Sequence, residues 1–141
     1  MTDQIKPLNW KPVHGIGYTV VRRPDGGMHY TFTDLSEATV RHWQEFAHEH
    51  LFEADRLTRN LYDLRQVREV SELAIRTAIE VNSDPAARNI RLAVVVASEA
   101  VAEAIRKIAA SALPETSAAI RIFTELTEAD AWLSRPLDQI V

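Results

Sequence analysis

Two short segments near the start of the chain alternate between apolar and polar residues. Every second residue is apolar from Ile16 to Val20 and again from Met28 to Phe32. The intervening Pro24-Asp25-Gly26-Gly27 is typical of a turn, because proline fixes φ and glycine permits positive φ. The pattern therefore predicts a β-hairpin over residues 16–33.

Helical spacing and short apolar runs then alternate along the rest of the chain. Apolar residues recur every three to four positions over about 35–53, after Ser71 and after Ser98, and a last short helix is expected after Thr127. Strands are expected at 57–64, 91–97 and 119–123. The run Leu92-Ala93-Val94-Val95-Val96 predicts a strand covered on both faces.

The predicted order of elements is ββαβαβαβα. Strands that alternate with helices imply right-handed crossovers and a mainly parallel sheet, to which the hairpin adds an antiparallel pair. We therefore expect an α/β fold with a mixed sheet of about five strands flanked by about four helices. Ligands and partners of such folds usually bind where the strands run into the helices.

Four helix starts carry residues that can cap them. Asp34 with Glu37 and Thr127 with Asp130 have the spacing of a capping pair, and Ser71 and Ser98 are good N-cap residues. Val70 and Ile75 can also close a hydrophobic staple around Ser71.

Length and composition place the chain among single soluble domains. It has 141 residues, a formal net charge of −4 and no cysteine. We expect an arm at 1–14, one domain at 15–135 and a tail at 136–141, without a signal peptide or a membrane span. A mildly acidic chain without clustered basic residues argues against nucleic acid or membrane as a partner. We expect a cytoplasmic protein, and the exposed edge of the hairpin favours a homodimer.

The chain resembles the STAS superfamily of anti-sigma-factor antagonists, and its SpoIIAA-like branch most closely. The resemblance spans about residues 15–135. The matching pieces are Tyr62-Asp63-Leu64-Arg65-Gln66-Val67, Leu92-Ala93-Val94-Val95-Val96, and Ile122-Phe123 with Leu126, Glu128-Ala129 and Ala131-Trp132-Leu133.

This resemblance implies a domain without chemistry of its own, acting through contacts around the loop after Asp63-Leu64. In the phosphorylatable antagonists, Asp-Ser stands at the start of the following helix. Here the two positions hold Ser71 and Glu72, so an acidic residue replaces the serine. The phosphoserine switch is therefore not expected to carry over.

The predicted partner-binding residues are Asp63, Arg65, Gln66, Ser71 and Glu72. Free N–H groups at a helix start and Arg65 would together favour a carboxylate or phosphate of a partner protein. Four of them also have a purely structural interpretation. Asp63 and Arg65 can anchor the loop by hydrogen bonds, Ser71 can simply cap the helix, and Glu72 is an ordinary first-turn acid.

A small apolar ligand is the alternative to a protein partner. Trp43, Leu51, Phe52 and Leu57 can line a cavity between a helix and the sheet, although core packing explains them equally well. No catalytic constellation, cofactor motif or metal site is expected. His42, Glu45 and Glu49 share a helix face but offer only one imidazole, and His48 and His50 point apart.

Overall fold

The computed structural model describes residues 11, 13–24, 27–51, 58–82, 90–111 and 119–135, with only the backbone at 50, 51, 58, 90 and 119. The predicted order ββαβαβαβα is confirmed. The elements are β1 (Tyr18–Arg22), β2 (Met28–Phe32), α1 (Glu37–Leu51), β3 (Thr58–Asp63), α2 (Glu72–Asn82), β4 (Ile90–Val95), α3 (Glu99–Ser111), β5 (Ala119–Phe123) and α4 (Leu126–Leu133). Of the expected arm at 1–14, only residues 11, 13 and 14 are described, and the expected tail lies outside the description.

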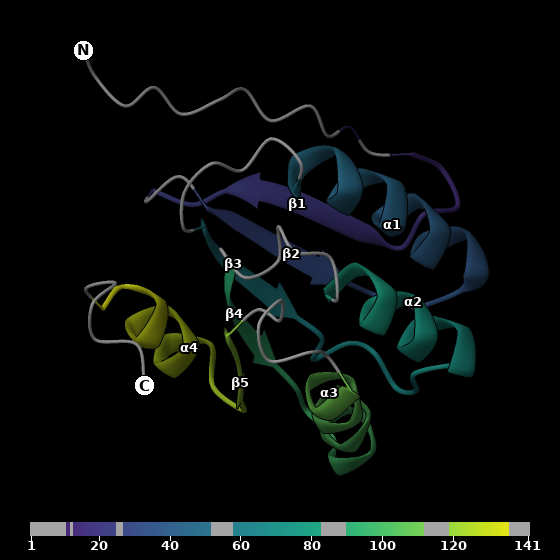
Figure 1. The fold of residues 1–141 in the computed structure, drawn as a ribbon. Coiled ribbons are helices and arrows are strands. Elements are labelled where there is room, and N and C mark those ends of the chain that lie inside the picture. The colour runs from purple at the N-terminus through teal and green to yellow at the C-terminus, as the bar shows by residue number, and fades with distance from the viewer. Residues whose placement is uncertain are drawn as a thin grey trace.

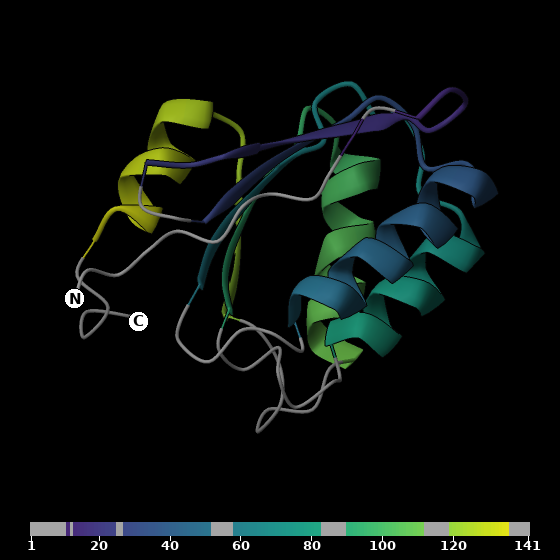
Figure 2. The ribbon, with the colours of Figure 1, turned by 90° about the horizontal axis from the view of Figure 1, so that it is seen from above.

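The five strands form one mixed sheet in the order β1-β2-β3-β4-β5. β1 is antiparallel to β2, and every other neighbouring pair is parallel. The right-handed crossovers place α1, α2 and α3 together on one face of the sheet. Among the described elements, α4 is the one that covers the other face, beside β3, β4 and β5 (Figures 1 and 2).

Two hydrophobic cores lie on the two faces of this sheet. The larger one fills the space under α1, α2 and α3, and cross-strand contacts of aromatic rings line its floor. Tyr30 and Tyr62, for example, have ring centroids 4.4 Å apart. The smaller core joins α4 to the sheet, and its buried members are Leu61, Ala93, Val95, Ala129, Trp132 and Leu133. Because side chains alternate across a strand, β3 and β4 supply residues to both cores.

The helix caps agree with the sequence at two starts and differ at two. Ser71 Oγ accepts the Ala74 N–H at 3.1 Å, and Ser98 Oγ accepts the Val101 N–H at 3.3 Å, which confirms both predicted caps. The predicted cap at Asp34 is wrong, because α1 begins only at Glu37 and Ser36 caps it.

The predicted cap of the last helix, Thr127 with Asp130, is also wrong. α4 begins at Leu126, after Glu125, whose side chain makes no cap hydrogen bond. Thr127 and Asp130 therefore lie inside the helix.

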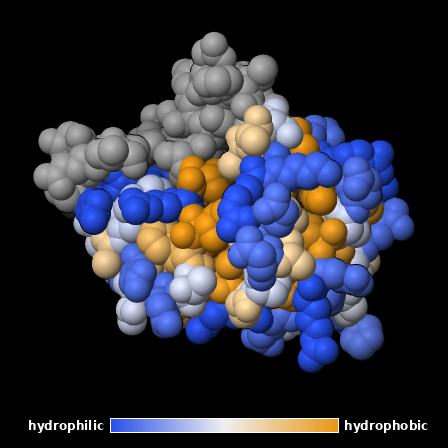
Figure 3. Space-filling model, turned by 90° about the horizontal axis from the view of Figure 1, so that it is seen from below, coloured by the Kyte–Doolittle hydropathy of each residue, from blue (hydrophilic) through white to orange (hydrophobic). Residues whose placement is uncertain are grey.

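Both ends of the described sheet are edge strands. β1 carries Val21, which is 58% exposed. β5 carries the partly buried Ile120, Ile122 and Phe123. Seen from below, on the side of β5 and α3, apolar side chains reach the surface between polar ones (Figure 3). The homodimer expected from an exposed edge strand stays a prediction. No helix among the described residues is long and apolar enough to cross a membrane.

Candidate functional site

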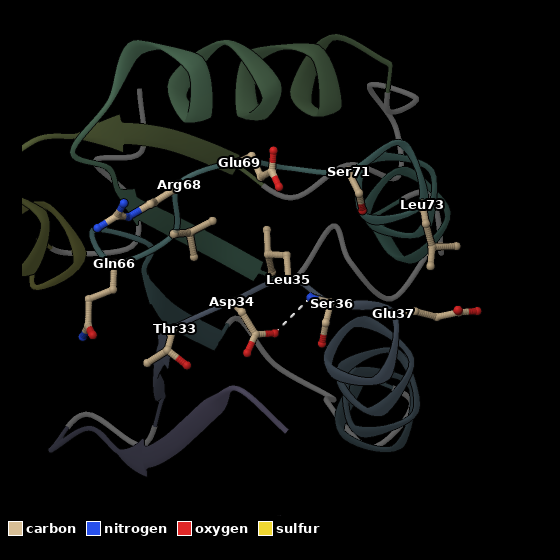
Figure 4. A pocket seen from close by; sticks show the side chains of 11 residues that line it. Thr33, Asp34, Leu35, Ser36, Glu37, Gln66, Arg68, Glu69, Ser71 and Leu73 are labelled. Atoms are coloured by element: carbon tan, nitrogen blue, oxygen red, sulfur yellow. Dashed lines mark hydrogen bonds between the residues drawn. The ribbon is translucent and has the colours of Figure 1, made fainter. Parts of the chain in front are cut away.

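A groove lies at the carboxyl edge of the sheet, between the loops that follow β2 and β3. These strands are parallel neighbours, so residues 33–36 and 64–71 leave the sheet side by side. The groove has a volume of about 640 Å³ (Figure 4). Its lining consists of Thr33, Asp34, Leu35, Ser36, Glu37, Gln66, Val67, Arg68, Glu69, Ser71 and Leu73.

The wall after β2 is organised by Asp34. Its Oδ1 accepts the Ser36 N–H at 2.9 Å and the Thr39 hydroxyl at 2.8 Å. These hydrogen bonds, the backbone one foremost, lower the pKa of Asp34, so the carboxylate stays ionised. The fully buried Thr39 also accepts the Gly17 N–H through its Oγ1 at 2.8 Å, which ties the wall to the chain entering β1.

Gly17 is placed so that even a methyl group would displace this wall. A Cβ at Gly17 would overlap the Asp34 carboxylate, which two hydrogen bonds hold in place. We expect Gly17→Ala to lower the free energy of unfolding by about 1–3 kcal/mol, as overpacking commonly does. Chemical denaturation measures the loss, and Gly15→Ala is unsuited as a control because Gly15 has φ 85°.

Thr19→Ala, at an exposed position two residues away, is the better control and should change stability by less than about 0.5 kcal/mol. Equal stability of Gly17→Ala and the unmodified chain would show that Asp34 is free to move.

The wall after β3 is anchored by Asp63 and Arg65. Arg65 donates three hydrogen bonds to the carboxylate: its Nε at 2.9 Å, its Nη2 at 2.8 Å and its backbone N–H at 3.1 Å. The Asp63 side chain is 8% exposed and that of Arg65 is 45% exposed. Burial alone would raise the pKa of Asp63, but the hydrogen bonds from Arg65 outweigh it and lower that pKa below its ordinary value. These hydrogen bonds agree with the loop-anchor interpretation of the pair, and its part in partner binding stays a prediction.

The other predicted site residues of this loop differ in position and role. Gln66 and Ser71 line it, and both are exposed. Ser71 Oγ already accepts the Ala74 N–H, so it acts as the cap of α2. Glu72 is exposed in the first turn of α2 but does not line the groove, and neither do Asp63 and Arg65. The structure therefore places Gln66 and Ser71 at opposite ends of one groove (Figure 4), with Asp63 and Arg65 holding their loop.

The opposite wall, residues 33–37, was not among the predicted site residues. The parallel pairing of β2 with β3 creates it, and the sequence does not specify which strands are neighbours. Arg68 and Glu69 were missed as well, although they belong to the predicted loop. Both are exposed and lie between the buried Val67 and Ala74. The signal for them in the sequence was the pair of adjacent charged residues within the loop.

A second, apolar hollow lies below the groove, between the sheet and the helices. Its volume is about 70 Å³. Trp43 lines it and donates its Nε1–H to the Tyr62 hydroxyl at 2.9 Å. Phe52 and Leu57, and the side chain of Leu51, lie outside the described residues. Sites for drug-sized ligands usually measure about 300–1,000 Å³, so this hollow is far too small for a lipid.

A group of ionisable residues gathers on the α4 side of the sheet. Arg23 is buried and pairs with Asp130 of α4 at 2.8 Å. Nearby, His29 Nε2 is buried without a hydrogen-bond partner among the described residues. Burial lowers the pKa of His29 from its ordinary value of 6.5, and the negative charge of Asp63 opposes that shift only in part.

His29 is expected to make the fold sensitive to mild acid. Below about pH 6.5 the unfolded chain binds a proton at His29 while the folded chain does not, so the free energy of unfolding falls as the pH falls. His29→Gln should flatten this dependence between pH 6.5 and the lowered folded pKa. Urea titrations at a series of pH values measure it.

Asp63 affects the free energy of unfolding in a separate, more acidic pH range. Its folded pKa is lowered, so its contribution is complete above the ordinary value of 3.8 and is lost as the pH falls through the folded pKa. His29→Gln should reduce that acidic loss only slightly, because the charge of His29 lowers the pKa of Asp63 less than the contacts with Arg65 do. An unaltered slope near pH 6 in His29→Gln would contradict the role given to His29.

The described residues contain no group of three or more metal-ligating side chains. His42, considered with Glu45 and Glu49 as a ligand set, instead packs on β1. Its Nδ1 lies 2.7 Å from the Tyr18 hydroxyl in a hydrogen bond.

Comparison with solved structures identifies the fold. The chain is similar to an uncharacterised protein of the DUF3478 family from Shewanella loihica PV-4, whose fold is described as SpoIIAA-like. The TM-score is 0.61 at 16% sequence identity, and the match covers 88% of this chain and 98% of that one. The protein thus has a SpoIIAA-like fold, as its resemblance to that branch implied. No protein-family model and no curated protein matches the sequence. At this identity the likeness defines the fold and no activity.

Proposed function

We propose that the protein is a binding module without catalysis of its own, and that its groove at the carboxyl edge of the sheet binds another protein. The observation that carries the proposal is the groove itself. Its volume of about 640 Å³ lies within the range of binding sites, and it lies where α/β sheets usually bind their ligands.

The construction of the groove supports binding. Both walls are loops held by internal hydrogen bonds, one at Asp34 and the other at Asp63. A loop that is already ordered loses little conformational entropy when a partner docks, which favours affinity. Exposed polar side chains, Gln66 and Glu69 among them, remain at the surface to contact that partner.

The groove offers little to a catalytic mechanism. Its lining contains no histidine or lysine, and among the described residues no hydrogen bond joins the Ser71 hydroxyl to one of the carboxylates that line the groove. The Ser71 hydroxyl oxygen serves as a helix cap, and Glu72 follows it directly. We therefore propose a regulatory interaction that does not depend on phosphorylation of Ser71.

A photo-crosslinking amino acid tests the proposal in the cells from which the sequence comes. Gln66, exposed in the groove, is replaced in one variant, and Lys107, exposed on the far part of α3, is replaced in the matched control. We expect Gln66 to give a discrete crosslinked protein that Lys107 does not give. Equal crosslinking from both positions, or none from Gln66, would contradict the proposal.

The second candidate function is that of a carrier, and it is limited to a very small apolar ligand. The hollow beside Trp43 measures about 70 Å³, which leaves room for a few carbon atoms. Native mass spectrometry of protein isolated from cells distinguishes the two functions. A reproducible bound mass would favour the carrier, and its absence together with a crosslinked protein would favour the binding module.

A further inference from the structure

The apolar hollow adjoins the groove at one residue, Leu35. Leu35 lines both spaces, and its side chain stands at the centre between the two loops (Figure 4). Below it the hollow is bounded by apolar side chains of α1, α2, α3 and the sheet, with Val70 and Ala78 only partly buried. A molecule in the groove therefore lies directly over an apolar hollow.

The size of the hollow limits what can enter it. An apolar cavity of about 150 Å³ holds one benzene molecule, so about 70 Å³ holds roughly half as much. That volume suits one short aliphatic side chain. In protein interfaces such a buried anchor in a well-packed pocket usually supplies a large share of the affinity.

The charges around the groove determine which residues of a partner can flank that aliphatic side chain. Asp34, Glu37 and Glu69 line it, against the single cation Arg68. Arg41 offsets Glu37 in a solvent-exposed pair at 3.1 Å, and Arg65, the nearby cation expected to attract an anion, is bound to Asp63. Asp34 stays ionised because its hydrogen bonds lower its pKa. The rim that remains is acidic, which complements a basic segment.

The acidic residues in the first turns of α1 and α2 also favour a positively charged partner segment. A helix N-terminus carries about half a positive charge, which by itself would attract an anion. Here Glu37 and Glu72 occupy the first turns, and the hydroxyls of Ser36 and Ser71 accept N–H groups there. The positive ends of both helices are thus already complemented within the chain.

From these observations we infer that the groove recognises a protein segment with one aliphatic side chain next to a lysine or arginine. The aliphatic side chain enters the hollow past Leu35, and the cation lies at the rim near Asp34 and Glu69. This inference rests on the proposed function, whose groove it uses, and adds the chemistry of the partner.

A random peptide library displayed on phage and selected on the immobilised full chain tests the inference. We expect the selected peptides to share one leucine, isoleucine or valine within a few residues of a lysine or arginine. Ala78→Leu fills the hollow from α2 and should weaken binding of a selected synthetic peptide by about tenfold or more. Glu69→Lys should weaken it as well, with the largest effect at low salt.

Ala110→Leu is the matched control, because it makes the same change at an exposed position of α3. It should leave peptide affinity unchanged. Circular dichroism shows whether Ala78→Leu is folded. If it is not folded, Ala74→Val, which fills the same hollow, replaces it.

Two results would overturn the inference. One is the selection of acidic peptides, or of none. The other is unchanged affinity in both filled variants. If Gln66 still crosslinks a protein in cells, such a result removes only the chemistry assigned to the partner. If Gln66 gives no crosslink, the proposed function fails with it.

Discussion

Replacing Trp132 by alanine is expected to lower the free energy of unfolding by about 3–5 kcal/mol. Trp132 is only 5% exposed and belongs to the small core that joins α4 to the sheet. Its ring contacts Phe123, with centroids 5.8 Å apart, and lies 5.4 Å from the guanidinium carbon of the buried Arg91. Among the described residues, Ala129 and Leu133 are the other buried side chains that α4 contributes to this core, and both are smaller than the indole, so its removal leaves a cavity.

Val21→Ala is the control for this change. Val21 lies on the edge strand β1 and is 58% exposed, so its truncation should cost less than about 0.5 kcal/mol. Urea or guanidinium titrations give both values, and circular dichroism shows whether the helix detaches before the sheet unfolds. A loss below about 1 kcal/mol in Trp132→Ala would mean that α4 contributes little to the fold.

Replacing Arg65 by alanine is expected to cost about 1–3 kcal/mol, more than an exposed arginine usually contributes. The reason is that the substitution leaves the Asp63 carboxylate without the side chain that binds it. Without the guanidinium, the Asp63 carboxylate stays buried and keeps only the backbone N–H of Arg65 among its described donors. Burial then dominates, so the pKa of Asp63 should rise.

A double-mutant cycle isolates this coupling. Asp63→Ala should also destabilise the chain, but the double variant should lose less than the sum of the two single losses, by about 1–2 kcal/mol. Arg68→Ala serves as the control, because Arg68 is exposed and makes no ion pair among the described residues. Additive losses from Asp63 and Arg65 would show that the pair does not anchor the groove wall.

Much of the fold follows from local sequence signals. Alternation predicted β1 and β2, and the strand expected at 119–123 coincides with β5. Ser71 and Ser98 predicted two helix starts, because a serine hydroxyl satisfies an N–H group that the helix leaves open. At Asp34 the same logic failed. Its carboxylate bonds the N–H of Ser36, two residues on, and so forms a turn before α1 instead of capping it.

The candidate site was predictable only in part, because half of it depends on strand order. The loop after Asp63 was found from the end of a strand and the start of a helix. Its opposite wall at residues 33–37 comes from a segment some thirty residues earlier, placed there by the pairing of β2 with β3. The sequence also left two interpretations of Asp63 with Arg65 open, a loop anchor and an anion-binding group, because a free arginine and a bound one look the same in a sequence.

The central claim is that a protein covers the groove in the cell, and cysteine labelling tests it most directly. The chain has no cysteine, so Gln66→Cys and the control Lys107→Cys each carry one reactive site. Both are labelled with a membrane-permeant maleimide, once as purified protein and once in the cells from which the sequence comes. We predict that Gln66→Cys reacts much more slowly in cells, relative to the purified protein, whereas Lys107→Cys shows no such slowing. Equal relative rates at the two positions would contradict the claim.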